Sequence, residues 1–390
     1  MIYIVIWMLL VILGLFFEKK KFNKFRNFFY YINFIILFIF IGFRAYVFSD
    51  WSHYKLGFDT IESLGNLIIG NRVGYYDQRF HYDFGYKIYE AIIKTVTDNY
   101  FYFIILDSFI DILILSFVFF KYLKNPIFGF LFFISFHGLW IEMDLMRNSR
   151  AIYLFLLSLN YLKKNRKIKY VTLNILGSIF HITSIIYIAG ITFLRIKIKK
   201  SIYIYTLIIL FILMELRISI LKNTILFISN NVSLPFLYKV NFYLNDSRWG
   251  SINYLSTIKK VEIIILIFVL FLYDNKIKKE TYLGQILINI TVSYLIIYLI
   301  AWDIKVFTER LSVLFVCFYW FLLADLFEIL KNEKKYFLNM LILLYAFISL
   351  YKQYYIYESE LRKETVRYQN ILFDYDNYDE KLLKLENANK

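Results

Sequence analysis

Cysteine is almost absent from this sequence, and Cys317 is the only one. A single thiol excludes disulfide bonds within the chain and thiolate clusters that hold metals. Proline is nearly as rare, at Pro126 and Pro235, so helices are seldom interrupted. GxSxG, Walker-type, HExxH and CxxC motifs are also missing, which leaves hydrolase, NTPase and metalloprotease functions without motif support. We expect no metal and no cofactor.

Apolar residues dominate what is present. They make up 60% of the 390 residues and the mean hydropathy is +0.55, whereas soluble domains are about half apolar. Apolar runs of helix length recur from one end of the chain to the other, which predicts a polytopic helical membrane protein. The net charge of +15 comes largely from lysine clusters between these runs, a pattern that the positive-inside rule explains. Nucleic acid is not an expected partner.

The order of apolar runs and lysine clusters predicts an all-α fold with about 11–12 transmembrane or re-entrant helices. Basic residues follow the first run and do not precede it, so we place the N-terminus outside. The predicted parts are a membrane domain at 1–352, long outer loops at about 44–99 and 223–258, and a polar tail at 353–390. Residues 60–69 and 357–373 are candidate surface helices.

Residues 170–194 form one apolar run with basic residues at both ends. A single span would place one basic cluster outside and invert every later loop, against the positive-inside rule. We therefore predict a hairpin of two short helices that breaks near residues 177–181. Broken helices occur at membrane depth where they line a cavity, and His181 would lie at the tip of this hairpin on the outer side.

Two acids and two arginines separate the apolar runs at residues 127–141 and 151–162. They are Glu142, Asp144, Arg147 and Arg150. Charges are costly at membrane depth, so they persist mainly where they have a function. We expect Asn148 and Ser149 to cap the second helix, and arginines beside a helix N-terminus favour phosphate binding. The alternative is a hairpin turn whose arginines contact lipid headgroups.

The predicted topology places most of the unusual polar residues outside. They are Arg44, Asp50, His53, His81, Asp83, Arg147, Arg150, His181, Arg248, Glu309 and Arg310. One outward-facing cavity would explain this set, because guanidinium groups bind a diphosphate bidentately and acids or a histidine accept a proton from a hydroxyl. As alternatives, His181 could pack between helices, Glu309 and Arg310 could pair, and the acids could only orient sugars. We expect Asp107 and Asp111, within a span, to hydrogen-bond between helices.

Five short motifs stand in order along the chain. The first is Arg44, Asp50 and Tyr54, with Phe48 and Ser49 where a glycine is usual. The second is Asp83-Phe-Gly85-Tyr86, and the third is Arg147-Asn148 opening a helix, with Ala151 three residues on. The fourth is Phe180-His181, followed by Thr183 and Ser184, and the fifth is Arg310, with Leu314 in place of a tyrosine. Together they resemble the motifs of Wzy-type polysaccharide polymerases, in the EpsG-like branch.

The resemblance covers about residues 1–330. It implies a GT-C-like, metal-independent glycosyltransferase that joins undecaprenyl-diphosphate-linked oligosaccharide repeats at the outer face of a bacterial inner membrane. The product would be O-antigen, capsule or exopolysaccharide. On this view Arg147, Arg150, Arg44 and Arg310 bind the diphosphate, His181, Asp50 or Asp83 transfers the proton, and Tyr54, Tyr86, Arg248 and Glu309 contact the sugars. Expected partners are the lipid-linked oligosaccharide, the membrane, a chain-length regulator and a flippase.

Two other functions remain open. A flippase or transporter of lipid-linked oligosaccharides would also need arginines in a cavity, although the chain shows none of the internal repeats that many transporters carry. The second is another membrane transferase, such as a polymer ligase or an acyltransferase. A cavity open only to the lipid and the outside would favour the polymerase or the ligase, and one that also opened inward would favour transport.

Overall fold

The computed structural model describes residues 1–18, 24–69, 83–231, 255–356 and 359–388. These residues are predominantly helical, and among them isolated bridges occur but no strand. The prediction of an all-α fold is confirmed. The chain divides into two compact units, Met1–Ile188 with Tyr319–Lys390, and Ala189–Phe318.

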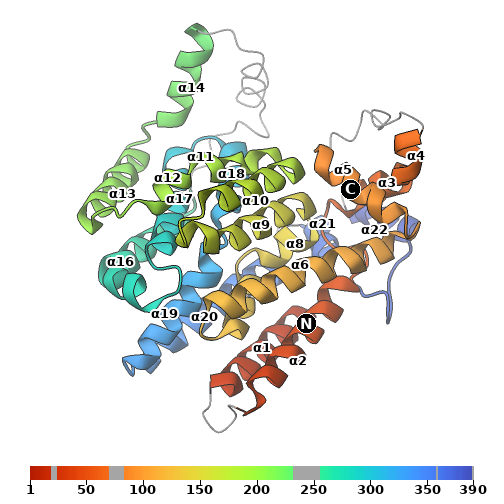
Figure 1. Cartoon of the computed structure of the whole chain (residues 1–390), viewed down its shortest axis with the longest axis horizontal. Coiled ribbons are helices and arrows are strands. Elements are labelled where there is room, and N and C mark those ends of the chain that lie inside the picture. Colours follow the sequence, from red (N-terminus) through yellow and green to blue (C-terminus); the bar gives the residue numbers. More distant parts are fainter. Residues whose placement is uncertain (19–23, 70–82, 232–254, 357–358, 389–390) are drawn as a thin grey trace. The chain divides into compact units, whose positions relative to one another are not determined.

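The first unit holds both ends of the chain (Figure 1). Its helices before the second unit are α1 (Ile2–Glu18), α2 (Arg26–Gly42), α3 (Trp51–Thr60), α4 (Leu64–Ile69), α5 (Phe84–Lys94), α6 (Tyr100–Tyr122), α7 (Pro126–Ser135), α8 (Gly138–Met143), α9 (Met146–Lys163), α10 (Lys167–Phe180) and the 3₁₀ helix η2 (Ile182–Ile185). After it come α19 (Phe318–Asn332), α20 (Tyr336–Tyr355), α21 (Glu360–Val366) and α22 (Tyr378–Ala388).

The second unit follows α11 (Ile186–Ala189), which crosses the boundary. Its helices are α12 (Ile191–Arg195), α13 (Lys200–Glu215), α14 (Ile220–Asn231), α16 (Thr257–Glu280), α17 (Gln285–Ile300) and α18 (Lys305–Phe315). The Asn289 side-chain amide donates to the carbonyls of Phe193, Leu194 and Ile196, so one buried asparagine ties the end of α12 to α17.

The first unit is built around α7, all of whose residues are buried. A helix that is apolar on every side belongs at the centre of a bundle. Its neighbours in space are α1, α2, α6, α8 and α20. The Asn125 side chain caps α7 by accepting from the N–H groups of Ile127 and Phe128, and Pro126 occupies the first helical position.

Helix α1 connects two ends of the first unit that differ in character. At one end the Tyr3 hydroxyl donates to the Val366 carbonyl at 2.8 Å. At the other end Glu18 pairs with Lys331 at 2.7 Å. We call these the Tyr3 end and the Lys331 end. The starts of α6 and α9 lie at the Tyr3 end, and the lysine-bearing ends of the same helices lie at the Lys331 end.

The predicted break in the run 170–194 is confirmed. Helix α10 ends at Phe180, His181 adopts an extended backbone, and η2 begins at Ile182. The Tyr170 hydroxyl donates to the Tyr187 carbonyl at 2.7 Å, although a continuous helix would separate residues 17 apart by about 25 Å. The chain therefore folds back on itself and presents His181 at the tip.

The run 127–141 is not the single helix that the sequence predicts. It breaks at His137, which has a φ of 60° in the left-handed region, and continues as α8. A Cβ on the next residue, Gly138, would lie 2.4 Å from the Phe133 carbonyl oxygen, so the close turn requires glycine there. His137 is exposed, and its backbone N–H donates to the Gln353 side chain at 3.2 Å.

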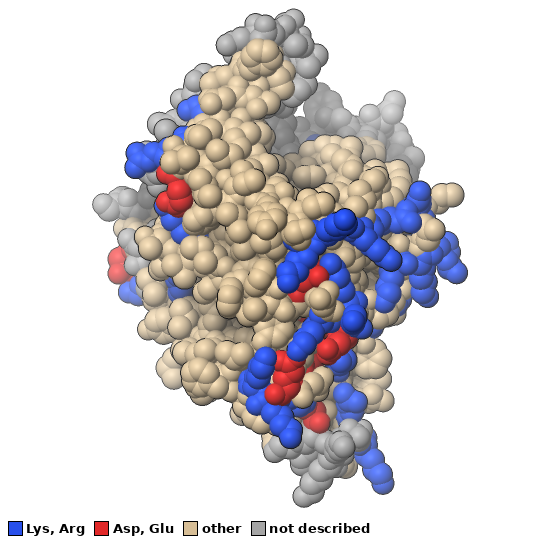
Figure 2. Space-filling view, turned by 90° about the vertical axis from the view of Figure 1, so that its left-hand side faces the viewer, with Lys and Arg blue, Asp and Glu red and all other residues tan. Residues whose placement is uncertain are grey.

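Two of the described helices, α6 and α20, are each long and apolar enough to cross a membrane. The number of possible spans rises to four if each of two bent helix pairs is counted as one span. One such pair is α13 with the start of α14, bent by 80°, and the other is α18 with α19. Shorter apolar helices are α1, α2, α7 and α17. The face in Figure 2 is largely uncharged, with lysines and arginines gathered in a band beside acids. Several apolar helices fit a polytopic membrane protein, and the number of spans stays a prediction.

The two regions predicted as an outer loop and a tail carry more helix than the sequence suggests. Residues 44–99 hold α3, α4 and α5 where one surface helix at 60–69 was expected. The predicted helix at 357–373 is shorter, because α21 ends at Val366. The segment that follows it packs against residues 39–48, as described below.

Candidate active site

The site begins at the start of α9, which lies earlier in the chain than expected. The helix begins at Met146, so Asn148 and Ser149 lie inside its first turn and do not cap it. The Ser149 hydroxyl donates instead to the Met146 carbonyl and to Asp111, at 2.8 and 3.2 Å. Arg147 is therefore the second helical residue, beside N–H groups that have no partner within the helix.

Three of the predicted site residues meet at one carboxylate. Asp83 Oδ2 lies 3.3 Å from Arg147 Nη1 and 3.5 Å from His181 Nδ1. Asp83 stands directly before α5, Arg147 opens α9, and His181 follows α10, so three elements contribute one side chain each. The three side chains keep 21%, 25% and 13% of their surface exposed, respectively. We call Asp83, Arg147 and His181 the triad.

Glycine at position 85 brings α5 and α10 close enough to form the triad. A Cβ on Gly85 would lie 2.3 Å from Ile179 Cγ2 and 2.8 Å from the Ile179 carbonyl oxygen. Any larger residue would push the start of α5 away from the end of α10, and with it Asp83 from His181. The acid-x-Gly spacing of this motif thus has a packing reason.

Tyr54 and Tyr86, which the sequence assigns to sugar binding, are 2% and 1% exposed. Their rings pack 5.6 Å apart, and the Tyr86 hydroxyl points to the Met146 sulfur at 3.9 Å. Tyr54 also interacts with the Arg147 side chain. The two tyrosines line the start of α9 and fix the direction of Arg147.

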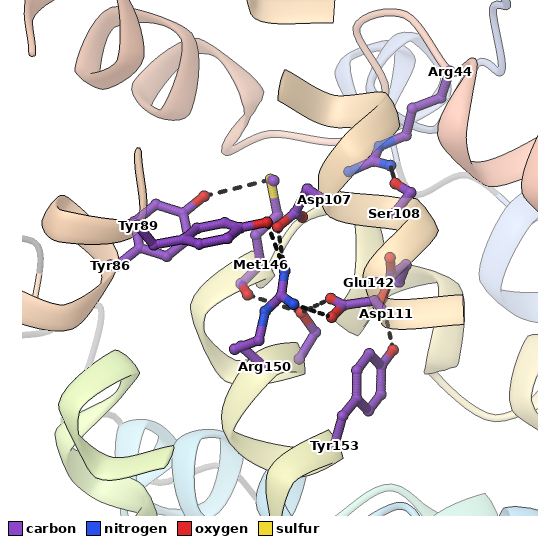
Figure 3. A network of polar contacts seen from close by, with 11 residues as sticks. Arg44, Tyr86, Tyr89, Asp107, Ser108, Asp111, Glu142, Met146, Arg150 and Tyr153 are labelled. Atoms are coloured by element: carbon purple, nitrogen blue, oxygen red, sulfur yellow. Dashed lines mark hydrogen bonds and ion pairs between the residues drawn. The ribbon is translucent and has the colours of Figure 1, made fainter. Parts of the chain in front are cut away.

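Arg150 has a different environment from Arg147 although both open the same helix. Its guanidinium pairs with Asp107 and, at 2.9 Å, with Asp111, and it lies over the Tyr89 ring, whose oxygen is 3.1 Å away. Figure 3 shows the arginine between the two carboxylates of α6. The prediction that Asp107 and Asp111 bond between helices is confirmed. Only 7% of the Arg150 side chain is exposed.

Two further charged groups belong to the same buried network. Arg44 donates to Ser108 at 2.7 Å and to the Ile41 carbonyl at 2.9 Å, and it is 3% exposed (Figure 3). Glu142 accepts a hydrogen bond from Tyr153 at 2.7 Å and is fully buried. The network contains three carboxyl groups and two guanidinium groups, so its charges are mostly compensated within the protein.

A family model described as the EpsG family matches residues 27–370, most of the chain. The chain belongs to the EpsG family. The resemblance that the five motifs suggest is therefore confirmed, and membership indicates a polymerase-like role in making surface polysaccharide at a membrane. No curated protein and no solved structure matches this EpsG-family chain.

The loop before α3 carries the remaining acid of the first motif in this EpsG-family chain. Asp144 accepts hydrogen bonds from the N–H groups of Ser49 and Asp50, at 2.9 and 2.7 Å, and from the Trp140 indole. Phe48 has a φ of 70°, a left-handed conformation that favours glycine. Burial and the nearby Asp144 carboxylate raise the pKa of Asp50 to about 6.

Three predicted site residues lie outside the described part of the first unit. Glu309 and Arg310 are exposed on α18, in the second unit, and Arg248 lies outside the described residues. Conversely, the sequence did not single out Tyr89 and gave Asp144 no separate role. Tyr89 stands three residues after Tyr86, so the helical period of α5 would have placed it beside the second motif.

Proposed function

We propose that this EpsG-family protein joins undecaprenyl-diphosphate-linked oligosaccharide repeats into a surface polysaccharide, as a metal-independent, GT-C-like transferase. The reaction takes place at the outer face of a bacterial inner membrane, with the Tyr3 end and the N-terminus outside. The triad is the observation that carries the proposal, since it joins a cation, a carboxylate and a histidine that the sequence assigned to complementary steps.

Arg147 is the group that binds the donor diphosphate. Its side chain is partly exposed, and it is the second residue of α9, at the positive end of the helix dipole. A guanidinium and a helix N-terminus together favour phosphate oxygens. Neutralising the diphosphate makes it a better leaving group, and such electrostatic stabilisation is typically a large catalytic term.

His181 accepts the proton from the acceptor hydroxyl. Asp83 Oδ2 lies 3.5 Å from its Nδ1, and neither ring nitrogen has a hydrogen-bond partner among the described residues. The acceptor oxygen forms a bond to the anomeric carbon of the donor, the bond from that carbon to the diphosphate breaks, and the hydroxyl proton passes to Nε2. Asp83 fixes the orientation of both His181 and Arg147, and Asp50 orients the sugar hydroxyls.

The two buried arginines, Arg150 and Arg44, hold the helices that carry the site. Arg150 and Arg44 are already bound by groups of the protein, so we assign them to holding α9 and α2 on α6. Among the arginines of the first unit that the sequence linked to the diphosphate, this leaves Arg147 as the one that meets it. The roles of Arg310, Arg248 and Glu309 stay predictions.

The test is complementation of a gene deletion in the natural host. Wild type, Arg147→Ala, His181→Ala and the control Arg166→Ala are expressed at matched levels, and the surface glycan is separated on a gel. Arg166 is exposed at the Lys331 end of the first unit, so its loss should leave a normal ladder. We expect single repeat units without a ladder for both site variants.

Two outcomes would overturn the proposal. A normal ladder in both site variants would mean that the triad is not catalytic. If no repeat unit reached the surface and lipid-linked units accumulated in the cytoplasm, transport would be the missing step, and the flippase would replace the polymerase.

A further inference from the structure

We infer that residues 365–378 form a strap that orders residues 43–50 and thereby positions Asp50 at the triad, on the same side of the membrane. The role of Asp50 in this inference rests on the proposed function. The statement that the strap and the triad lie on the same side of the membrane does not. The sequence gives only a polar tail here, and neither the family match nor the motifs assign it a role.

The strap binds residues 43–48 through the backbone. The Ala45 N–H donates to the Gln369 carbonyl at 2.9 Å, and the Ile371 N–H donates to the Phe43 carbonyl at 2.9 Å. The Phe48 N–H donates to the Thr365 carbonyl at 2.6 Å. An isolated bridge joins Arg44 and Asn370. Paired backbone groups on both sides of this bridge give the two segments a fixed register.

Side chains fasten both ends of the strap. The Tyr368 hydroxyl donates to the Phe40 carbonyl at 2.7 Å, and the Tyr368 ring stacks on the Phe40 ring. At the far end the Tyr378 ring meets the edges of Trp51 and Tyr46, at centroid distances of 5.6 and 6.1 Å. Such aromatic pairs contribute beyond the area that they bury.

A buried lysine closes the strap on α21. Lys381 is fully buried and its Nζ donates to the Glu364 carbonyl at 2.7 Å. Burial lowers the pKa of Lys381 to about 8. A lysine is almost never buried unless it is paired, so this contact indicates one specific folded arrangement of α21 and α22.

The strap is connected to the triad through a short series of contacts. It holds Phe48 in its left-handed conformation, and Ser49 and Asp50 follow directly. Asp144 binds the N–H groups of both and lies two residues before Met146, where α9 begins. Loosening the strap would therefore release the loop that carries Asp50 while leaving the buried core at α7 in place.

The shared side is tested by single cysteines in a Cys317→Ser background. Exposed positions are Val96→Cys near the start of α6, Phe373→Cys on the strap and Ile168→Cys at the Lys331 end; they are 79%, 84% and 83% exposed. Intact and permeabilised cells are treated with a membrane-impermeant maleimide. We expect positions 96 and 373 to label in intact cells and position 168 only after permeabilisation.

The outcomes separate this inference from the proposed function. Labelling of position 373 together with 168, and not with 96, would overturn the strap. Labelling of 96 and 373 only after permeabilisation, with 168 reactive in intact cells, would keep the strap but reverse the orientation in the proposed function.

Positioning is tested by Tyr378→Ala, with Tyr378→Phe as the conservative variant and Phe373→Ala as the exposed control. For Tyr378→Ala we expect shortened glycan ladders and about tenfold faster hydrogen exchange at the Ala45 and Phe48 amides, with unchanged exchange in α7. Tyr378→Phe should leave both the ladder length and the exchange rates as in wild type. Tyr368→Phe, which removes a single hydroxyl, serves if the alanine variant does not accumulate.

Unchanged exchange at Ala45 and Phe48 in Tyr378→Ala or Tyr368→Phe would overturn the strap as an ordering element. Fast exchange with a normal ladder would overturn its link to Asp50. Failure of the proposed function would show differently, as a normal ladder in Arg147→Ala and His181→Ala or as lipid-linked units that accumulate in the cytoplasm.

Discussion

Two arginines, one helical turn apart, illustrate how strongly environment decides the role of a residue. Arg147 and Arg150 look equivalent in the sequence, and both were expected to bind a diphosphate. In the structure Arg147 meets one partly exposed carboxylate, whereas Arg150 is buried between two. A guanidinium whose hydrogen-bond donors are already bound has little left to offer a ligand.

Neutral replacements should separate these roles. Arg150→Met leaves Asp107 and Asp111 buried without their counter-charge, which typically costs roughly 3–5 kcal/mol, so we expect a large fall in melting temperature. Arg147→Met breaks a pair that is partly exposed to water and leaves a single carboxylate, so the protein should lose much less stability than Arg150→Met does, but make no polymer. Thermal melts in detergent and glycan gels measure both effects.

The control is Arg150→Met combined with Asp107→Asn and Asp111→Asn. Removing all three charges should recover most of the lost stability, because the unpaired carboxylates are then gone. A single Arg150→Met variant with wild-type stability would contradict the anchoring role.

Asp50 should make stability depend on pH. Its pKa is raised to about 6, above the value of about 4 for an exposed aspartate, so the folded state binds more protons in that window. Stability therefore falls as the pH rises from about 4 to about 6. We expect Asp50→Asn to melt above wild type at pH 7.5 but not at pH 4, and to lose polymer.

The Asp98→Asn variant is the comparison for that experiment, since it changes the same charge on a side chain that is 90% exposed. Equal melting temperatures for Asp50→Asn and wild type at both pH values would show that Asp50 ionises as freely as a surface group.

At the scale of elements, small residues determine how closely helices approach at the site. Gly85 sets the contact of α5 with α10, and Gly177 faces Ala151 where α10 packs on α9. The Ala151 of the third motif therefore has a packing reason, just as Gly85 does. These contacts bring three separate helix ends to one carboxylate.

A graded set of glycine substitutions tests this. Gly85→Ala should abolish polymer formation, because its Cβ would lie 2.3 Å from Ile179 Cγ2 and 2.8 Å from the backbone oxygen. Gly177→Ala, whose Cβ would lie 3.5 Å from Ala151 Cα, should be tolerated. Gly65→Ala meets nothing within 4 Å and is the control. The readout is the glycan ladder at equal protein level, and a normal ladder for Gly85→Ala would refute the packing argument.

The sequence predicted the helix break at His181 but not the one at His137, for a physical reason. The break at His181 followed from charge, since lysines at both ends of one apolar run conflict with a single span. The break at His137 has no such signal. The break at His137 depends on a residue in the left-handed conformation, followed by a glycine in close contact with Phe133. The sequence around His137 gives no sign of that contact.

For the whole molecule, the sequence predicts the helical class, the membrane character and the family. The sequence also predicts that Arg147, Asp83 and His181 share one site, because the order and spacing of their motifs and the expected side of the membrane all agree. It could not distinguish Arg147 from Arg150, since their difference lies in two aspartates about 40 residues earlier in the chain. The strap escaped prediction for the same reason: its partners are far apart in the sequence.

That distance also sets the order in which the protein is completed during synthesis. Tyr368 binds a carbonyl made 328 residues earlier. At a translation rate of roughly 5–20 residues per second, about 16–66 seconds separate the two partners on the ribosome. The loop that carries Asp50 thus lacks its strap until α21 and the residues after it have been made, and a nascent chain stalled before α21 has all of its triad but none of its strap.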